Sequence, residues 1–196
     1  MTTSTDTSRI SISAHYTGYV WYKNGLSDPR YVTPLGRLSN VLFSPVNGLL
    51  KVMAGAHIDT FLLQRHLMLD HLLCQLIENE GVEQVVELAS GLSPRGFRLT
   101  EKYPQISYLE TDLPDMAAHK AQLLNKLNRP TRHGVRSCNI LEADGPDSIA
   151  SVLNELDPTK KVIVITEGLV NYFPLPVIRE VWSRLAKNLK RFPDAY

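Results

Sequence analysis

The 196-residue sequence is poor in cysteine, in long apolar runs and in excess charge of either sign. Its two cysteines, Cys74 and Cys138, lie far apart without metal-ligand spacing, so we expect two buried thiols and neither a metal site nor a disulfide scaffold. No apolar run approaches the roughly 20 residues that cross a bilayer, and residues 1–13 lack the apolar segment of a signal peptide. The sequence therefore predicts a cytoplasmic protein that does not enter a membrane.

The charge balance also argues against a nucleic-acid partner. Lys and Arg total 21 and Asp and Glu total 20, for a net charge of +1, whereas nucleic-acid binding usually needs a strongly basic face. Hydrophobic residues make up 43% of the chain, which is ordinary for a globular protein of a size that buries a substantial core.

The first part of the chain shows no regular periodicity. Residues 1–12 are polar and predict a disordered tail, and residues 14–57 are rich in aromatics but irregular. Pro29, Pro34 and Pro45 are expected to break any long helix there. The sequence favours an arm, spanning residues 1–57 with the tail, that packs on the main domain. A lid over a cofactor or substrate pocket is the alternative.

From residue 58 onward, helical and strand patterns alternate. A long amphipathic helix begins near Asp59 or Thr60 and ends near Gly81. Four short apolar strands then alternate with four helices, the third of them capped by Asp147. The strands are expected at 84–88, 107–110, 135–140 and 162–166, and the helices at 94–103, 114–128, 147–156 and 174–189. This alternation predicts an α/β domain over residues 58–196, with a Rossmann-like, doubly wound parallel sheet.

The predicted order of elements stops where another strand would follow. The last helix should lead into a fifth strand, and no strand pattern follows it. We therefore expect a sheet truncated after the fourth strand and its helix, in a domain incomplete at its C-terminus. A bare edge beside the fourth strand would pair with a second copy, which predicts a homo-oligomer.

A turn of small residues follows the first strand. Ala89 and Gly91 permit close approach of a ligand to the backbone, as at a nucleotide site. A dinucleotide fold favours G-x-G-x-x-G, and the three positions here are Ala89, Gly91 and Pro94, of which the last has no N–H. A nicotinamide-dependent oxidoreductase is thus a disfavoured alternative.

Polar residues follow or end each predicted strand. The carboxyl ends of parallel strands share one edge of a sheet, which is where ligands bind in open α/β folds. A carboxylate at the end of the second strand commonly binds ribose, and Glu110 and Asp112 project to the same side of an extended chain. Several acids at one edge suit a cationic ligand group. The residues expected at this edge are Glu87, Glu110, Asp112, Asn139 and Glu167.

Four segments resemble one family. They are residues 65–70, an Arg followed by an Asp on a helix; residues 84–98, the strand and small-residue loop; residues 108–114 with Lys120; and residues 166–174, with Glu-Gly, Tyr and Pro. In order and spacing they resemble class I S-adenosylmethionine-dependent methyltransferases of the leucine carboxyl methyltransferase-like family, in its small-molecule and polyketide O-methyltransferase branch.

The resemblance implies a role for each matching position. Arg65 would bind the methionine carboxylate of the cofactor, and Glu167 would face its amino group or sulfonium. The cofactor-binding set is Arg65, Glu87, Ala89, Gly91, Glu110, Asp112, Asn139, Ile140 and Glu167. In it, Ala89 and Gly91 lie under the methionine part, Asp112 with Glu110 at the ribose, and Asn139 and Ile140 beside the adenine. Ala89 stands where the family usually has Gly, and Ser93 where it usually has Asp.

The function implied is methyl transfer from S-adenosylmethionine to a hydroxyl or carboxylate oxygen of a small molecule or a protein C-terminus. A carboxylate acceptor needs no general base, and Tyr172 is the candidate for positioning the acceptor. No metal is expected. The alternative is a non-catalytic interaction or assembly module, or a fragment, that retains the methyltransferase fold.

Overall fold

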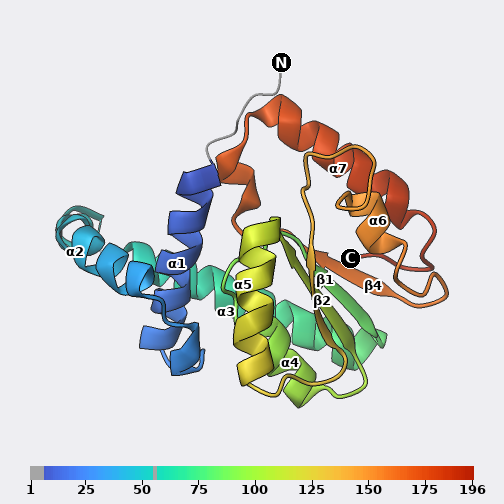
Figure 1. The fold of residues 1–196 in the computed structure, drawn as a ribbon, viewed down its shortest axis with the longest axis horizontal. Coiled ribbons are helices and arrows are strands. Elements are labelled where there is room, and N and C mark those ends of the chain that lie inside the picture. Colours follow the sequence, from blue (N-terminus) through green and yellow to red (C-terminus); the bar gives the residue numbers. More distant parts are fainter. Residues whose placement is uncertain (1–6, 55–56) are drawn as a thin grey trace. The chain divides into compact units, whose positions relative to one another are not determined.

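The computed structural model describes residues 7–54 and 57–196, which fall into two units. The helical unit comprises the chain up to Leu72 together with Gly91–Arg95, and the sheet unit comprises Leu73–Ser90 and Gly96–Tyr196. The ribbon is coloured along the sequence in Figure 1. The predicted division into an arm or lid of residues 1–57 and a domain of residues 58–196 stays a prediction.

A four-stranded parallel sheet forms the centre of the sheet unit, as the alternation of patterns predicted. Its strands are β1 (Gln84–Glu87), β2 (Ser107–Asp112), β3 (His133–Ser137) and β4 (Val162–Ile165), in the order β3-β2-β1-β4. The helices are α4 (Arg95–Lys102), α5 (Pro114–Lys126), α6 (Ile149–Leu153) and α7 (Leu175–Leu189), with a 3-10 turn η2 (Leu169–Tyr172) after β4. This order is that of a Rossmann-like nucleotide-binding fold.

Helices cover both faces of the sheet, α6 and α7 on one and α4 and α5 on the other (Figure 1). Val86 of β1 packs with residues of α6 and α7 in one hydrophobic cluster, which includes Val152 and Val181. Side chains alternate along a strand, so Glu87 points to the opposite face, where its carboxylate accepts a hydrogen bond of 2.7 Å from the Tyr108 hydroxyl.

The end of the chain extends the sheet, so the expected bare edge beside the fourth strand was wrong. The backbone N–H of Val162 donates to Asp194 (3.1 Å), and those of Tyr196 and Val164 bond to Val162 (3.0 Å) and Tyr196 (2.9 Å). Residues 194–196 thus pair with β4 in the parallel sense. Three residues are too few to show a hydrophobic period in the sequence. A homo-oligomer stays a prediction, without this edge to support it.

The segment around β3 differs from the prediction at both ends. Pairing with β2 runs from His133 to Ser137, and the apolar pattern beyond it comes from residues that leave the sheet and pack in the core. Ser148 caps α6 in place of Asp147, since its Oγ accepts the N–H of Ser151 (3.2 Å). The Asp147 carboxylate instead accepts the Ser137 hydroxyl at 2.6 Å, which ties the loop to β3.

The helical unit overturns the expected irregular arm. It contains α1 (Thr7–Lys23), η1 (Pro29–Tyr31), α2 (Pro34–Ala54) and the start of α3 (Ile58–Glu80). The expectation that prolines break any long helix was wrong for α2. Pro34 begins this helix, where a missing N–H has no cost, and Pro45 is accommodated inside it. The predicted tail is helical from Thr7, and its first six residues lie outside the described residues.

A small aromatic core holds the helical unit together. Tyr16, Val20 and Trp21 of α1 are buried against apolar residues of α3. The Tyr16 hydroxyl donates to the Asp59 carboxylate at 2.5 Å, and burial together with this hydrogen bond raises the pKa of Tyr16 to about 12. Over residues 7–54 and 57–196, no helix is long and apolar enough to span a membrane.

Candidate functional site

The loop after β1 is hydrogen-bonded to the ends of both neighbouring strands, β4 and β2. The N–H of Leu88 donates to Ile165 of β4 at 2.9 Å, and that of Ser90 donates to Thr111 of β2 at 2.9 Å. The end of β2 is bonded in turn to the segment after β3, because the Cys138 N–H donates to Asp112 at 2.7 Å. Within the sheet unit, the carboxyl ends of the strands therefore form one continuous edge.

Two residues of this loop have left-handed backbone. Ala89 has φ 53° and Gly91 has φ 51°. Glycine adopts this region freely, whereas the Cβ of Ala89 carries a cost of roughly 1–2 kcal/mol. A non-glycine residue kept in this conformation marks a turn whose shape is set by its surroundings and not by local preference.

Asp112 ends β2 at the same edge. Its Oδ1 accepts the N–H of Leu113 at 2.8 Å, which orients the carboxylate just before α5 begins. The residue is 8% exposed. Its place beside the loop after β1 matches the ribose-binding acid of βαβ cofactor sites.

Glu110, two residues earlier, is enclosed. Its Oε2 lies 2.9 Å from Nζ of Lys120 on α5 and 3.2 Å from Nε2 of His133 on β3, and all three side chains are 0% exposed. Burial by itself raises the pKa of Glu110, but the charges of Lys120 and His133 outweigh it and hold the pKa below 4.5. We call these three residues the buried ion cluster.

The buried ion cluster reaches the loop after β1 through Lys120. The Lys120 ammonium donates to the Ser90 hydroxyl at 3.2 Å. Gly96 of α4 closes the other side, because a Cβ there would lie 2.6 Å from Nε2 of His133 and 2.7 Å from Oε1 of Glu110. The cluster is therefore packed without room for a methyl group.

Of the acids predicted at the strand edge, Glu87 and Glu110 have partners inside the fold. Glu87 is 1% exposed beside Tyr108, and Glu110 is 0% exposed in the buried ion cluster. A cofactor contact by either carboxylate stays a prediction, and Asp112 is the better placed of the two acids on β2.

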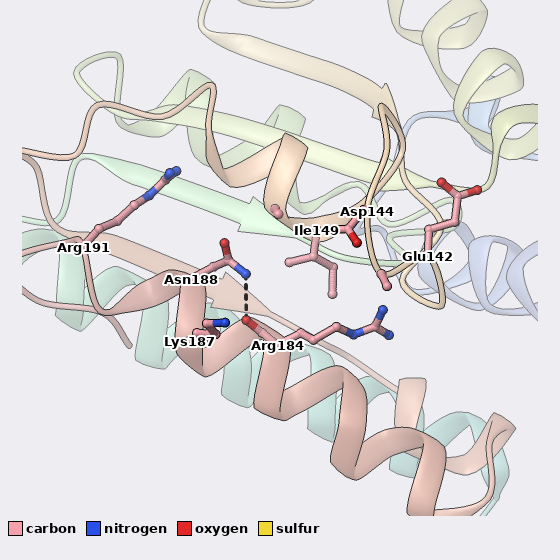
Figure 2. A pocket seen from close by; sticks show the side chains of 9 residues that line it. Glu142, Asp144, Ile149, Arg184, Lys187, Asn188 and Arg191 are labelled. Carbon is pink, nitrogen blue, oxygen red and sulfur yellow. Dashed lines mark hydrogen bonds between the residues drawn. The ribbon is translucent and has the colours of Figure 1, made fainter.

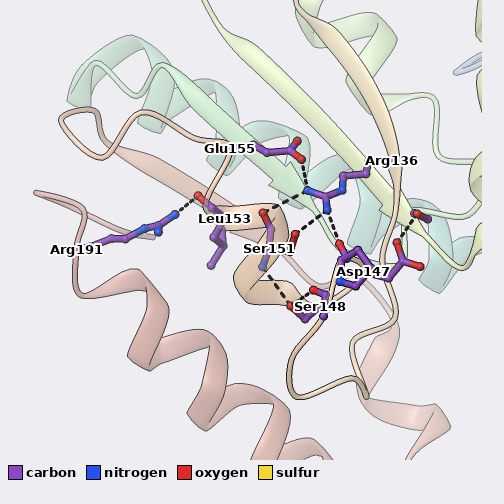
Figure 3. Close-up of polar contacts among 10 residues, drawn as sticks. Arg136, Asp147, Ser148, Ser151, Leu153, Glu155 and Arg191 are labelled. Atoms are coloured by element: carbon purple, nitrogen blue, oxygen red, sulfur yellow. Dashed lines mark hydrogen bonds and ion pairs between the residues drawn. The ribbon is translucent and has the colours of Figure 1, made fainter.

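The loop after β3 carries Asn139 and Ile140, the residues predicted beside adenine. Asn139 bonds through its N–H to Asp147 at 2.8 Å, which closes the loop. Arg136 of β3 holds the other end of this loop next to α6. It donates to the Ser151 hydroxyl at 2.8 Å, to the Pro146 carbonyl and to the Glu155 carboxylate (Figure 3).

From α7, Arg184 donates to the carbonyls of Ile140 at 3.1 Å and Leu141 at 3.3 Å. Arg184 also lines a groove between the loop and α7, shown in Figure 2. None of the predicted cofactor residues lines that groove, whose side chains mix acids and bases. The loop after β3 is thus held on two sides by arginines.

Glu167 comes two residues after the end of β4, at the same edge of the sheet. It is half-buried and precedes Gly168, whose φ of 75° starts the η2 turn. Tyr172 ends that turn and is 42% exposed. Both predicted roles stay predictions. In the described ranges, no group of three or more His, Cys, Asp or Glu side chains is arranged to bind a metal ion.

Arg65 and Gly91 belong to the helical unit, so their approach to the strand tips stays a prediction. Arg65 is half-buried on α3. A Cβ on Gly91 would lie 3.1 Å from the Cβ of Ala14, so α1 packs closely on Gly91. Further along, Ser93 Oγ accepts the Arg95 N–H at 3.3 Å, at the start of α4.

Arg95 anchors the end of this turn in the helical unit. Its side chain is 0% exposed, with Nε 2.6 Å from Oδ1 of Asp70 and Nη2 2.8 Å from Nδ1 of His66. The His66 ring stacks on Trp21, with ring centroids 4.3 Å apart. Asp70 and Arg95, both in segments that carried the family resemblance, are therefore partners of each other.

Sequence reasoning assigned no role to Lys120, His133 or Arg95. One signal was present for Lys120: it lies on the face of its helix that also carries Leu123 and Leu124, so a lone cation sits on an apolar stripe. A lysine there needs a buried anion, and the sequence pattern offered no means of choosing which acid.

Comparison with known proteins identifies the family of this chain. A model of the leucine carboxyl methyltransferase family matches residues 48–186. A provisionally named S-adenosyl-L-methionine-dependent methyltransferase of Mycolicibacterium gilvum is 35% identical over 96 residues, covering 48% of this chain and 30% of that protein. A protein of Mycolicibacterium smegmatis with a similar name is 34% identical over 95 residues, covering 48% and 30%.

The fold also recurs in a solved structure. A provisionally named methyltransferase of Thermobifida fusca superimposes with a TM-score of 0.64 at 15% identity, covering 90% of this chain and 61% of that one. The sheet unit is a Rossmann-like α/β fold of the methyltransferase type. The chain belongs to the leucine carboxyl methyltransferase family. The matched stretch spans about a third of the length of the curated relatives.

Proposed function

We propose that this chain binds S-adenosyl-L-methionine and serves methyl transfer to an oxygen of a small molecule or a protein C-terminus, as a hydroxyl or a carboxylate. The observation that carries the proposal is the edge formed by the left-handed turn at Ala89 and the carboxylate of Asp112. The family and the names of the relatives supply the class of reaction.

The residues at the edge fit the cofactor in chemistry. A turn of small residues leaves the backbone accessible to the methionine part, and Asp112 offers an oriented carboxylate to two ribose hydroxyls. Ile140 packs in the core and would border adenine only from the end of a loop that Arg184 holds. The absence of an N–H at Pro94 disfavours a pyrophosphate at this loop, which argues against a dinucleotide.

The chemistry supplied by the cofactor is an activated methyl group: the acceptor oxygen forms the new C–O bond, and the S–C bond breaks with its electron pair remaining on sulfur. The protein contributes orientation and a dry site. Asp112 would hold the ribose, and the turn at Ala89 would lie under the methionine chain. Arg65 would bind the methionine carboxylate. A carboxylate acceptor arrives already ionised and requires no general base, whereas a hydroxyl acceptor must lose its proton to a base as the C–O bond forms.

Calorimetric titration with S-adenosylhomocysteine tests the proposal on the 196-residue chain. Binding is expected for the wild type. Asp112→Asn keeps one oxygen for the Leu113 N–H but removes a charged acceptor for ribose, so we expect affinity to fall about tenfold or more.

Asp115→Asn is the matched control, because Asp115 is an exposed acid three residues further along, in the first turn of α5. Its affinity should equal that of the wild type. No binding by the wild type near millimolar ligand, or equal losses for the two variants, contradicts the proposal.

A further inference from the structure

Lys120 has two partners from two different elements. Its fully buried ammonium lies 2.9 Å from Oε2 of Glu110 on β2 and 3.2 Å from Oγ of Ser90 in the loop after β1. Glu110 is the anion that faces this ammonium, and it also faces His133 on β3. The second contact, to a neutral hydroxyl, is therefore not required for neutralisation, and its effect is to hold Ser90.

Ser90 lies between two residues of unusual backbone conformation. The residues on either side, Ala89 and Gly91, both have left-handed backbone, so neither continues a strand or begins a helix. Ser90 is held at its backbone by the bond from its N–H to Thr111 at 2.9 Å, and at its side chain by Lys120. Removing the side-chain bond leaves Ser90 held by its backbone bond to Thr111.

We propose that Lys120 is a positioning residue for cofactor binding, which sets Ala89 and Ser90 relative to the end of β2 by bridging Ser90 and Glu110. The inference rests on the proposed function. Lys120 is enclosed and would not contact the cofactor itself. It acts through Ser90 on the turn beneath the methionine part, and through Glu110 on the strand that ends in Asp112.

A purely structural role makes a different prediction. If Lys120 only neutralises Glu110, removing both charges together repairs the fold and restores function. If Lys120 positions the turn, the same double replacement repairs the fold but leaves Ser90 without its side-chain bond. The double variant Glu110→Gln/Lys120→Met separates the two, because methionine keeps the length of the buried stem.

The test compares Lys120→Met, the double variant and Ser90→Ala by thermal unfolding and by titration with S-adenosylhomocysteine and with adenosine. We expect the double variant to regain much of the melting temperature lost in the single variant. Its affinity for S-adenosylhomocysteine should stay about tenfold below that of the wild type.

Ser90→Ala should keep the wild-type melting temperature and bind S-adenosylhomocysteine several-fold more weakly. Affinity for adenosine, which lacks the methionine part, should change less than twofold. Lys126→Met, at an exposed lysine of the same helix, is the control and should match the wild type throughout. Recovery of both stability and affinity in the double variant overturns the inference.

Hydrogen exchange at the Ser90 amide in the ligand-free chain supplies a readout independent of binding. Loss of the Lys120 contact should speed this exchange about tenfold in the double variant, because the bond from Ser90 to Thr111 opens more often. Unchanged exchange refutes the positioning role even if no ligand binds. Absence of binding by the wild type refutes the proposed function and, with it, the assigned purpose of the turn.

Discussion

Replacing Arg95 with methionine removes the charge that Asp70 and His66 share in the helical unit. The guanidinium is 0% exposed and lies 2.6 Å from the Asp70 carboxylate, whose side chain is 12% exposed. Methionine keeps much of the volume, so the main effect is a buried carboxylate without its partner. Breaking such a pair costs about 3–5 kcal/mol. Because Asp70 retains some exposure to water, we expect about 3 kcal/mol.

Urea unfolding measures this loss. With a slope of about 1–3 kcal/mol per molar, typical of small proteins, the midpoint should fall by between about 1 and 3 M. Arg30→Met is the control: Arg30 also forms a close pair with Asp28, at 2.8 Å, but on the exposed surface, so its midpoint should stay at the wild-type value.

A double-mutant cycle isolates the pair. Asp70→Asn combined with Arg95→Met removes both charges, so the double variant should be more stable than the sum of the single losses predicts, by about 2 kcal/mol. Strict additivity, or an Arg95→Met midpoint equal to that of Arg30→Met, refutes the reading of Arg95 as the anchor of the turn.

Three further predictions concern packing and ionisation. Gly96→Ala should cost about 1–3 kcal/mol, because its Cβ would lie 2.6 Å from His133, whereas Gly48→Ala, with open space around the Cβ, should be neutral or slightly stabilising in the same thermal melt. The hydrogen bond of Tyr16 contributes stability that is fully present below pH 10.0 and is lost as the pH rises towards the raised pKa of Tyr16, about 12. In Tyr16→Phe, urea midpoints should therefore decline less at alkaline pH. An unchanged decline contradicts the assignment. Burial raises the pKa of the Cys138 thiol to about 11, so iodoacetamide at about pH 8 should label it only after denaturation, as read by mass spectrometry; rapid native labelling counts against the buried position.

The sheet was predictable because its signal is local. The apolar runs around Val86 and Ile163 and the breaks after them are visible within a few residues, and β1 and β4 begin where the pattern placed them. The order of the strands was not predicted. Their shared edge follows because parallel strands all end on the same side of a sheet. Asp112 at the tip of β2 could be named for the same reason.

The partners of charged side chains could not be predicted in this way. Glu110 and Asp112 are two residues apart and look alike in the sequence, yet Glu110 faces Lys120 and His133 across a packed helix and a neighbouring strand. Those contacts join residues far apart in the sequence, and the helical and strand periodicities report only on near neighbours. Helix α2 was not predicted for another reason. The rule that proline breaks a helix is statistical, and α2 tolerates Pro45 in its interior.

The five-residue helix α6 is far shorter than the length at which a helix persists alone in water. The helix is stabilised by Arg136, which donates hydrogen bonds to the Ser151 hydroxyl and carbonyl, and by the cap at Ser148. Such an element is a natural place for sub-global opening, in which one turn melts while the strands stay paired. Transient melting there would part Arg136 from Ser151 and leave Arg184 of α7 to hold the segment that carries Ile140.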